Sequence, residues 1–122
     1  MDKKKILLVE DDNLTRNLLL KMIGSLGYDV DSCENGEAAI SKIKEYGPDL
    51  IITDIVMPEF SGLQLLNFVQ KKMTRNIPTL LISTMDVKVV EDLVDDIGAV
   101  GFISKPPTKE DLKYKIELGL KL

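Results

Sequence analysis

Residues 50–54 read Leu-Ile-Ile-Thr-Asp, a short apolar run that ends in an acidic residue. Three other runs of Val, Ile and Leu end on polar side chains in the same way: ILLVEDD at 6–12, LLIST at 80–84 and VGFISKP at 100–106. Short and nearly continuous apolar runs are typical of parallel strands that are buried on both faces. Ligands of open parallel sheets bind beyond the carboxyl ends of the strands, so these four endings predict one shared pocket.

Segments with helical periodicity separate the apolar runs, and capping residues mark their ends. Gly27 and Gly47-Pro48 are placed to end the first two helices. The start signals, in chain order, are Asp12, Asn35, Ser61 with Gln64, Asp86, and Thr108 with Asp111. The first helix is expected to bury Leu18, Leu19, Met22, Ile23 and Leu26.

Five strands alternating with five helices predict an α/β protein with a flavodoxin-like, doubly wound (βα)5 sheet. The second strand is placed near residues 29–32, and the strand order is expected to be 2-1-3-4-5. One domain is expected to cover residues 1–122. Because the first and third strands are neighbours in this order, Asp54 is expected to lie beside Glu10 and Asp11.

Composition excludes several kinds of function. The net charge of −4 argues against direct binding of nucleic acid, which needs a clustered positive surface. The chain contains no histidine, which excludes histidine-based triads and a histidine phosphodonor within it. A single cysteine, Cys33, fits a reducing cytoplasm, and no apolar run approaches the roughly 20 residues of a membrane span.

The acidic residues at the strand ends predict a cation site. Glu10, Asp11 and Asp54 would repel one another, and oxygen ligands select a hard ion, best Mg2+, for which Mn2+ can substitute. Asp11 and Asp54 are the expected ligands, with Glu10 acting through water, whereas Asp12 serves mainly as a helix cap. A carboxylate beside Mg2+ can attack phosphorus and form an aspartyl phosphate. Lys105 and the Ser83 hydroxyl would then stabilise the transferring oxygens.

The motifs ILLVEDD, LIITDIVMPEFSG, LLIST and GFISKP, in this order and spacing, closely resemble the receiver domain of two-component response regulators. The resemblance extends from Lys4 to Leu120. It implies that Asp54 is the phosphoacceptor and that Glu10 and Asp11 are the acidic pair. It also makes Asp11 a direct Mg2+ ligand and the backbone carbonyl of Val56 another.

The same resemblance assigns the residues of a conformational switch. Lys105 becomes the lysine that senses the phosphoryl group, with a cis bond to Pro106. Ser83 takes the position of the switch hydroxyl, and Phe102 that of the rotating aromatic ring. Thr84 stands where the family often has a smaller residue, which narrows the route to the phosphoryl site.

The resemblance also implies partners and a readout surface. A sensor histidine kinase or a histidine phosphotransfer protein would supply the phosphoryl group, and an unknown downstream protein would bind the face made by helix four, strand five and helix five. The chain would be a monomer or a weak, phosphorylation-dependent dimer. It would phosphorylate and dephosphorylate itself rather than turn over a separate substrate. Helix four is expected to carry a broad apolar arc of Val87, Val89, Val90, Leu93, Val94 and Ile97.

Other readings explain the residues less well. A phosphatase of the haloacid dehalogenase type would have a second aspartate where Val56 stands, and a flavodoxin phosphate would be repelled by residues 10–12. The open alternative is a receiver-like interaction module whose partner binding does not depend on phosphorylation.

Overall fold

The computed structural model describes residues 3–57, 61–72, 76–84, 88, 91–92 and 98–121. In chain order the elements are β1 (Lys5–Val9), α1 (Asn13–Ser25), β2 (Asp29–Cys33), α2 (Gly36–Tyr46), β3 (Leu50–Asp54), α3 (Gly62–Lys72), β4 (Thr79–Ser83), β5 (Gly101–Ser104) and α5 (Lys109–Leu120). The five strands form one parallel sheet in the order β2-β1-β3-β4-β5. The predicted fold class and strand order are therefore confirmed.

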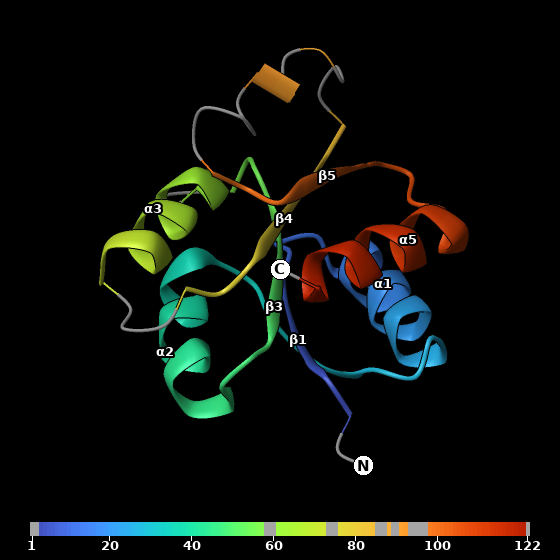
Figure 1. The fold of residues 1–122 in the computed structure, drawn as a ribbon, viewed down its shortest axis with the longest axis horizontal. Coiled ribbons are helices and arrows are strands. Elements are labelled where there is room, and N and C mark those ends of the chain that lie inside the picture. Colours follow the sequence, from blue (N-terminus) through green and yellow to red (C-terminus); the bar gives the residue numbers. More distant parts are fainter. Residues whose placement is uncertain are drawn as a thin grey trace.

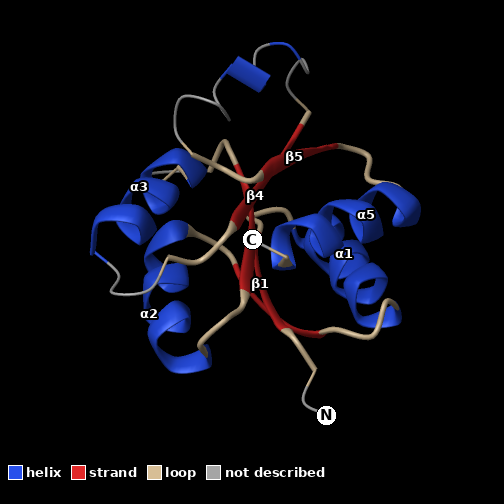
Figure 2. Ribbon diagram, viewed as in Figure 1, coloured by secondary structure: helices blue, strands red, loops and turns tan. Residues whose placement is uncertain are grey.

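The sheet separates two layers of helices. Helices α1 and α5 cover one face, and α2 and α3 cover the other (Figure 1). Figure 2 shows the same arrangement, with the strands in the middle layer. Most of the predicted fourth helix, with its cap Asp86 and its arc of Val87, Val89, Val90, Leu93, Val94 and Ile97, lies outside the described residues.

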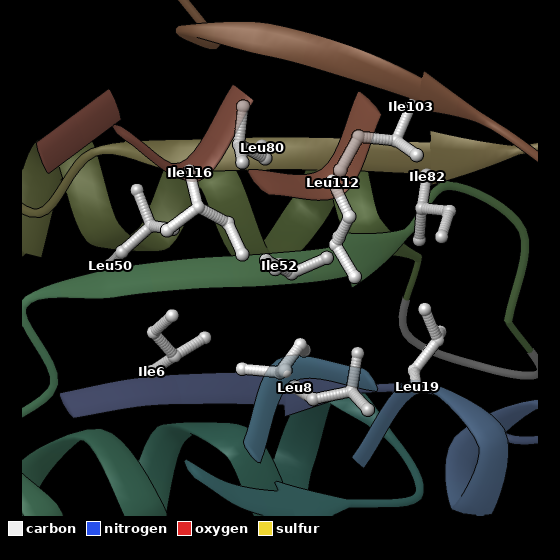
Figure 3. Close-up of a cluster of buried hydrophobic side chains, with 11 residues drawn as sticks. Ile6, Leu8, Leu19, Leu50, Ile52, Leu80, Ile82, Ile103, Leu112 and Ile116 are labelled. Carbon is white, nitrogen blue, oxygen red and sulfur yellow. The ribbon is translucent and has the colours of Figure 1, made fainter. Parts of the chain in front are cut away.

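Alternate residues of each strand pack on opposite faces of the sheet, because side chains of a strand alternate in direction. Ile6 and Leu8 of β1 contribute to the core beneath α1 and α5, whereas Leu7 and Val9 contribute to the core beneath α2 and α3. The first core also contains Leu19, Ile23, Leu50, Ile52, Leu80, Ile82, Ile103, Leu112 and Ile116 (Figure 3). A shift of one residue in pairing would move these side chains to the wrong face, so packing fixes where each strand ends.

The first two helices begin at the predicted caps. The Asp12 carboxylate accepts a hydrogen bond from the Thr15 N–H at 2.8 Å, and the Asn35 side chain accepts one from the Ala38 N–H at 2.8 Å. Gly47 ends α2 in the left-handed conformation, with φ of 64°, which glycine adopts without steric cost. Local sequence therefore sets these boundaries.

The capping boxes of the later helices differ in completeness. Ser61 and Gln64 form both reciprocal bonds, from Ser61 N to Gln64 Oε1 (2.8 Å) and from Gln64 N to Ser61 Oγ (3.2 Å). The Thr108 hydroxyl accepts from Asp111 N at 3.1 Å, but the Asp111 carboxylate lies 3.5 Å from Lys115 Nζ. Asp111 therefore contributes its backbone N–H to the cap, while its carboxylate forms an ion pair with Lys115 one turn further along the helix.

The prediction that Leu18 belongs to the core is wrong. Leu18 was expected to face inward, but it is 50% exposed. Leu19 and Ile23, four residues apart, are fully buried, and Met22 and Leu26 pack beside them. A helix turns about 100° per residue, so a face centred on Leu19 and Ile23 carries Leu18 to its edge.

Candidate functional site

Three carboxylates meet at the carboxyl edge of the sheet. Glu10 and Asp11 directly follow β1, and Asp54 is the last residue of the neighbouring strand β3. One oxygen from each of these carboxylates lies within 4.8 Å of the other two. Glu10 and Asp54 are buried, whereas Asp11 is exposed. The predicted convergence of the three acids is confirmed.

Lys105 reaches this cluster from the end of β5. Its Nζ lies 2.6 Å from Asp54 Oδ2 and 2.5 Å from Glu10 Oε1. The Lys105 N–H donates to the Ser83 carbonyl at 2.9 Å, and the Lys105–Pro106 peptide bond is cis, as the resemblance implied. One ammonium group therefore contacts carboxylates from the ends of two strands.

Burial and charge together set the protonation of the cluster. Burial is the largest effect on Glu10 and raises its pKa to about 7. The hydrogen bond from Lys105 lowers the pKa of Glu10, and the negative charge of Asp54 raises it. Burial alone would lower the Lys105 pKa, but its bonds to Asp54 and Glu10 outweigh this effect and raise it. Lys105 is therefore an ammonium at neutral pH, and Glu10 is close to its titration midpoint.

The donor set fits a hard divalent cation. When all three are ionised, Glu10, Asp11 and Asp54 carry three negative charges, and the Lys105 ammonium neutralises only one. Two negative charges within these four side chains are then unbalanced, at a position where Glu10 and Asp54 are buried and Asp11 is exposed. Carboxylate oxygens are the ligands that Mg2+ prefers in proteins. The residues present therefore match the predicted Mg2+ site in both charge and ligand type.

The backbone at Glu10 is held by a residue that the sequence did not indicate. Arg16, on the first turns of α1, donates from its guanidinium to the Glu10 carbonyl at 3.0 Å. The Asp12 N–H also donates to Glu10 Oε2, at 3.3 Å. Nothing in the sequence distinguishes Arg16 from a solvated helix residue. Its contact with Glu10 becomes visible only when the positions of α1 and β1 are known.

Asp54 is held by the loop that follows it. The Val56 N–H donates to Asp54 Oδ1 at 3.2 Å, and the Ile55 N–H donates to the Ile82 carbonyl on β4 at 3.3 Å. The Val56 side chain is exposed. The proposed role of the Val56 carbonyl as a ligand stays a prediction.

The predicted switch residues lie on the two strands nearest Lys105. Ser83 ends β4, is buried, and comes one residue after the position that pairs with Asp54. Thr84 is exposed. Phe102 of β5 is buried in a cluster beside α3, with Leu66 and Leu81 among its members. Its ring therefore belongs to the core, and the predicted rotation stays untested.

A doubly wound sheet with acids and a lysine converging at its carboxyl edge is the architecture of a receiver-type signalling domain. Comparison with known families agrees. The model of the response regulator receiver domain matches residues 6–117, and the chain belongs to this family. It is a receiver domain of response-regulator type, consistent with two-component signalling.

Two curated relatives illustrate the range of proteins that contain such a domain. The polar-differentiation response regulator DivK of Brucella anthropi is 33% identical over 84% of this chain and 85% of DivK. The 3',5'-cyclic-nucleotide phosphodiesterase regA of Dictyostelium discoideum is 35% identical over 97% of this chain. The chain spans only 15% of the length of that phosphodiesterase.

Solved structures show the same fold. The signal receiver domain of a putative LuxO repressor from Vibrio parahaemolyticus is 28% identical, with a TM-score of 0.87 over 98% of this chain and 91% of that one. A putative response regulator from Chloroflexus aurantiacus gives a TM-score of 0.92 over 99% of this chain and 100% of that one, at 24% identity. At that identity the second comparison supports the fold alone.

Receiver domains generally interact with histidine kinases or with phosphotransfer proteins.

The described helices give no sign of a membrane span, since none is both long enough and apolar enough to cross a bilayer.

Proposed function

We propose that this chain accepts a phosphoryl group on Asp54 from a histidine of a sensor kinase or phosphotransfer protein, in a reaction that requires Mg2+ or Mn2+. The observation that supports this most strongly is the position of the Asp54 carboxylate. It lies 2.6 Å from the Lys105 ammonium and within 4.8 Å of oxygens from two further acids. We place the protein in the cytoplasm, as a monomer or a weak dimer after phosphorylation.

The chemistry is a direct transfer between two nucleophiles. An oxygen of Asp54 attacks phosphorus, an O–P bond forms, and the P–N bond to the donor imidazole breaks. The electron pair of that bond stays on the imidazole nitrogen, which takes up a proton. Lys105 and the Ser83 hydroxyl offset the charge that develops on the phosphoryl oxygens. Hydrolysis of the resulting acyl phosphate resets the protein.

Asp11 and Asp54 would hold the cation, with the Val56 carbonyl as a further ligand and Glu10 acting through water. Bound there, Mg2+ would supply positive charge next to the phosphoryl oxygens. Arg16 fixes the Glu10 carbonyl and so limits movement of the β1 end that carries Glu10 and Asp11.

Output follows from the charge of the new group. A phosphoryl group adds about −1.5 to −2 charges and strong acceptor oxygens, so it competes for Lys105 and Ser83. The backbone N–H of Lys105 already donates to the Ser83 carbonyl, so the ends of β4 and β5 would respond together. Phosphorylation would shift the population toward a form in which Phe102 and the face of helix four, β5 and α5 bind a downstream protein. Exposed Thr84 would slow entry of the donor.

The decisive experiment is intact-protein mass spectrometry after incubation with acetyl phosphate and Mg2+. The wild type should gain one phosphoryl group, Asp54→Asn should gain none, and the surface control Asp31→Asn should behave as the wild type. If the wild type gains no mass and also fails to bind beryllofluoride, the interaction module that is independent of phosphorylation becomes the better explanation.

Lys105→Ala tests the switch separately from the chemistry. The variant should still accept phosphate on Asp54, although more slowly, but its affinity for a partner should change little on phosphorylation. Partner affinity can be measured by pull-down titration with and without beryllofluoride. A full phosphorylation response in Lys105→Ala would refute the role of this lysine.

A further inference from the structure

The peptide group of Asp54 is held from within its own strand. Thr53 is a fully buried polar residue near the carboxyl end of β3, directly after three apolar residues. Its Oγ1 donates to the carbonyl oxygen of Asp54 at 3.1 Å. The side chain of Thr53 therefore contacts the backbone of the phosphoacceptor and not its carboxylate.

The same carbonyl oxygen is approached closely by the first residue of α3. A Cβ atom placed on Gly62 would lie 2.0 Å from Asp54 O and 2.9 Å from Asp54 C, both backbone atoms that cannot rotate away. The Gly62 N–H donates to the Ile55 carbonyl at 3.0 Å. Helix α3 therefore begins in direct contact with the Asp54–Ile55 peptide, and only glycine permits this approach.

We infer that Thr53 and Gly62 are positioning residues for the phosphoacceptor, because both act on the Asp54 carbonyl oxygen. This inference rests on the proposed function and deepens it. Fixing the peptide fixes the Asp54 side chain, whose two oxygens meet Lys105 and the Val56 N–H. Reacting groups that are displaced by about 1 Å can lose on the order of 100-fold in rate. The two contacts thus set the position of the nucleophile before a donor arrives.

The chain offers a matched control for each contact. Thr79 of β4 is also a buried strand threonine, and its hydroxyl donates to a backbone carbonyl, that of Ile77, at 3.2 Å. Gly119 of α5 is also closely packed, since a Cβ there would lie 2.7 Å from the Leu50 side chain. Loss of a buried hydroxyl or overpacking of a glycine can therefore be compared at and away from Asp54.

The threonine test compares Thr53→Val with Thr79→Val, and Thr53→Ser restores the hydroxyl. Three quantities are measured: the rate of phosphorylation by acetyl phosphate at saturating Mg2+, the Mn2+ dissociation constant by electron paramagnetic resonance, and the thermal midpoint. Thr53→Val should slow phosphorylation roughly 3- to 10-fold, the equivalent of one hydrogen bond, and should weaken Mn2+ binding. Thr79→Val should lower the thermal midpoint similarly with a rate within about twofold of wild type. Thr53→Ser should recover most of the rate.

The glycine test compares Gly62→Ala with Gly119→Ala. Gly62→Ala should reduce the phosphorylation rate on the order of 100-fold in the fraction that is folded by circular dichroism, because the Cβ displaces the Asp54 peptide. Gly119→Ala should lower the thermal midpoint without a comparable loss of rate. If Gly62→Ala does not fold, the threonine set still decides the question.

The outcomes separate the two levels of the argument. Equal rates and equal Mn2+ affinities for Thr53→Val and Thr79→Val would overturn the positioning role while leaving phosphorylation intact. Absence of phosphorylation in the wild type would overturn the proposed function. In that case, weaker Mn2+ binding in Thr53→Val than in Thr79→Val would still support positioning of the Asp54 peptide, and equal binding would refute it.

Discussion

Two lysine–aspartate pairs in this protein have similar geometry and different surroundings. Lys42 of α2 lies 2.8 Å from Asp31 of β2, and both side chains are well exposed, at 37% and 38%. Lys105 lies 2.6 Å from Asp54, with the side chains 15% and 11% exposed. Lys105 also contacts a second carboxylate, that of Glu10, which solvent does not reach. Distance alone therefore does not distinguish the pair at the candidate site from the surface pair.

The difference lies in burial and in charge balance. The surface pair is one cation with one anion in contact with water, and such pairs contribute about 0–1 kcal/mol. At the carboxyl edge of the sheet one ammonium group meets several acids, and burial raises the pKa of Glu10 to about 7. An excess of buried negative charge is costly to a folded protein. The cluster of Glu10, Asp11 and Asp54 could therefore hold a metal ion, which would offset this charge.

Removal of each lysine should give the largest contrast. Lys105→Ala leaves buried carboxylates without their cation, so at pH 8 without Mg2+ it should lower the free energy of unfolding by about 3–5 kcal/mol. Lys42→Ala should lower it by no more than about 1 kcal/mol. Urea unfolding followed by circular dichroism measures both values. Similar losses in the two variants would show that the buried pair is not distinct in energy.

Dependence on pH should have opposite sign in the two regions. The folded-state pKa of Glu10, about 7, exceeds its ordinary value of 4.5, so the folded protein holds this proton more tightly than the unfolded chain. Without metal, the stabilising contribution of Glu10 should be fully present below pH 4.5 and should be lost as the pH rises through 7. The hydrogen bond to Lys42 lowers the pKa of Asp31 below 3.8, so its stabilising effect is lost as pH falls.

Urea midpoints measured in EDTA between pH 4.5 and 8 test this contrast. Glu10→Gln should remove the decrease in stability toward pH 7 and above, whereas Asp31→Asn should leave it unchanged. A decrease of the same size in Glu10→Gln would mean that another group titrates in this range.

Addition of Mg2+ should produce the smallest of the three effects. A ligand that binds only the folded state stabilises it by about 1.4 kcal/mol when it is present at ten times its dissociation constant. The wild type and Asp31→Asn should both gain this amount, and Asp11→Asn should gain little because it loses a proposed ligand. Thermal midpoints with Mg2+ and with EDTA measure the gain. An equal gain in Asp11→Asn would exclude this residue as a ligand.

The sequence predicted the features that depend on local pattern. Asp12, Asn35 and Gly47 lie at the helix boundaries where their side chains or backbone freedom are needed. The four apolar runs predicted β1, β3, β4 and β5, and the rules of parallel sheets predicted the strand order that brings Asp54 beside Glu10. Leu18 was misplaced because periodicity defines a helical stripe but not its centre, which depends on the neighbour against which the helix packs.

By itself, then, the sequence determined the described strands and helices, their order and the chemical types gathered at one edge, because these follow from residue patterns and from the side chains that end each strand. Only the tertiary structure decided how the site is held. The bond from Arg16 to the Glu10 carbonyl joins a helix to a strand end, and the contact of Gly62 with the Asp54 carbonyl joins α3 to β3. Thr53 is adjacent to Asp54 in the sequence, but its proposed role depends on burial. Because water does not reach the Thr53 hydroxyl, this group donates to the backbone carbonyl of Asp54. The contacts of Arg16 and Gly62 depend on distances between elements, and no pattern along the chain specifies them.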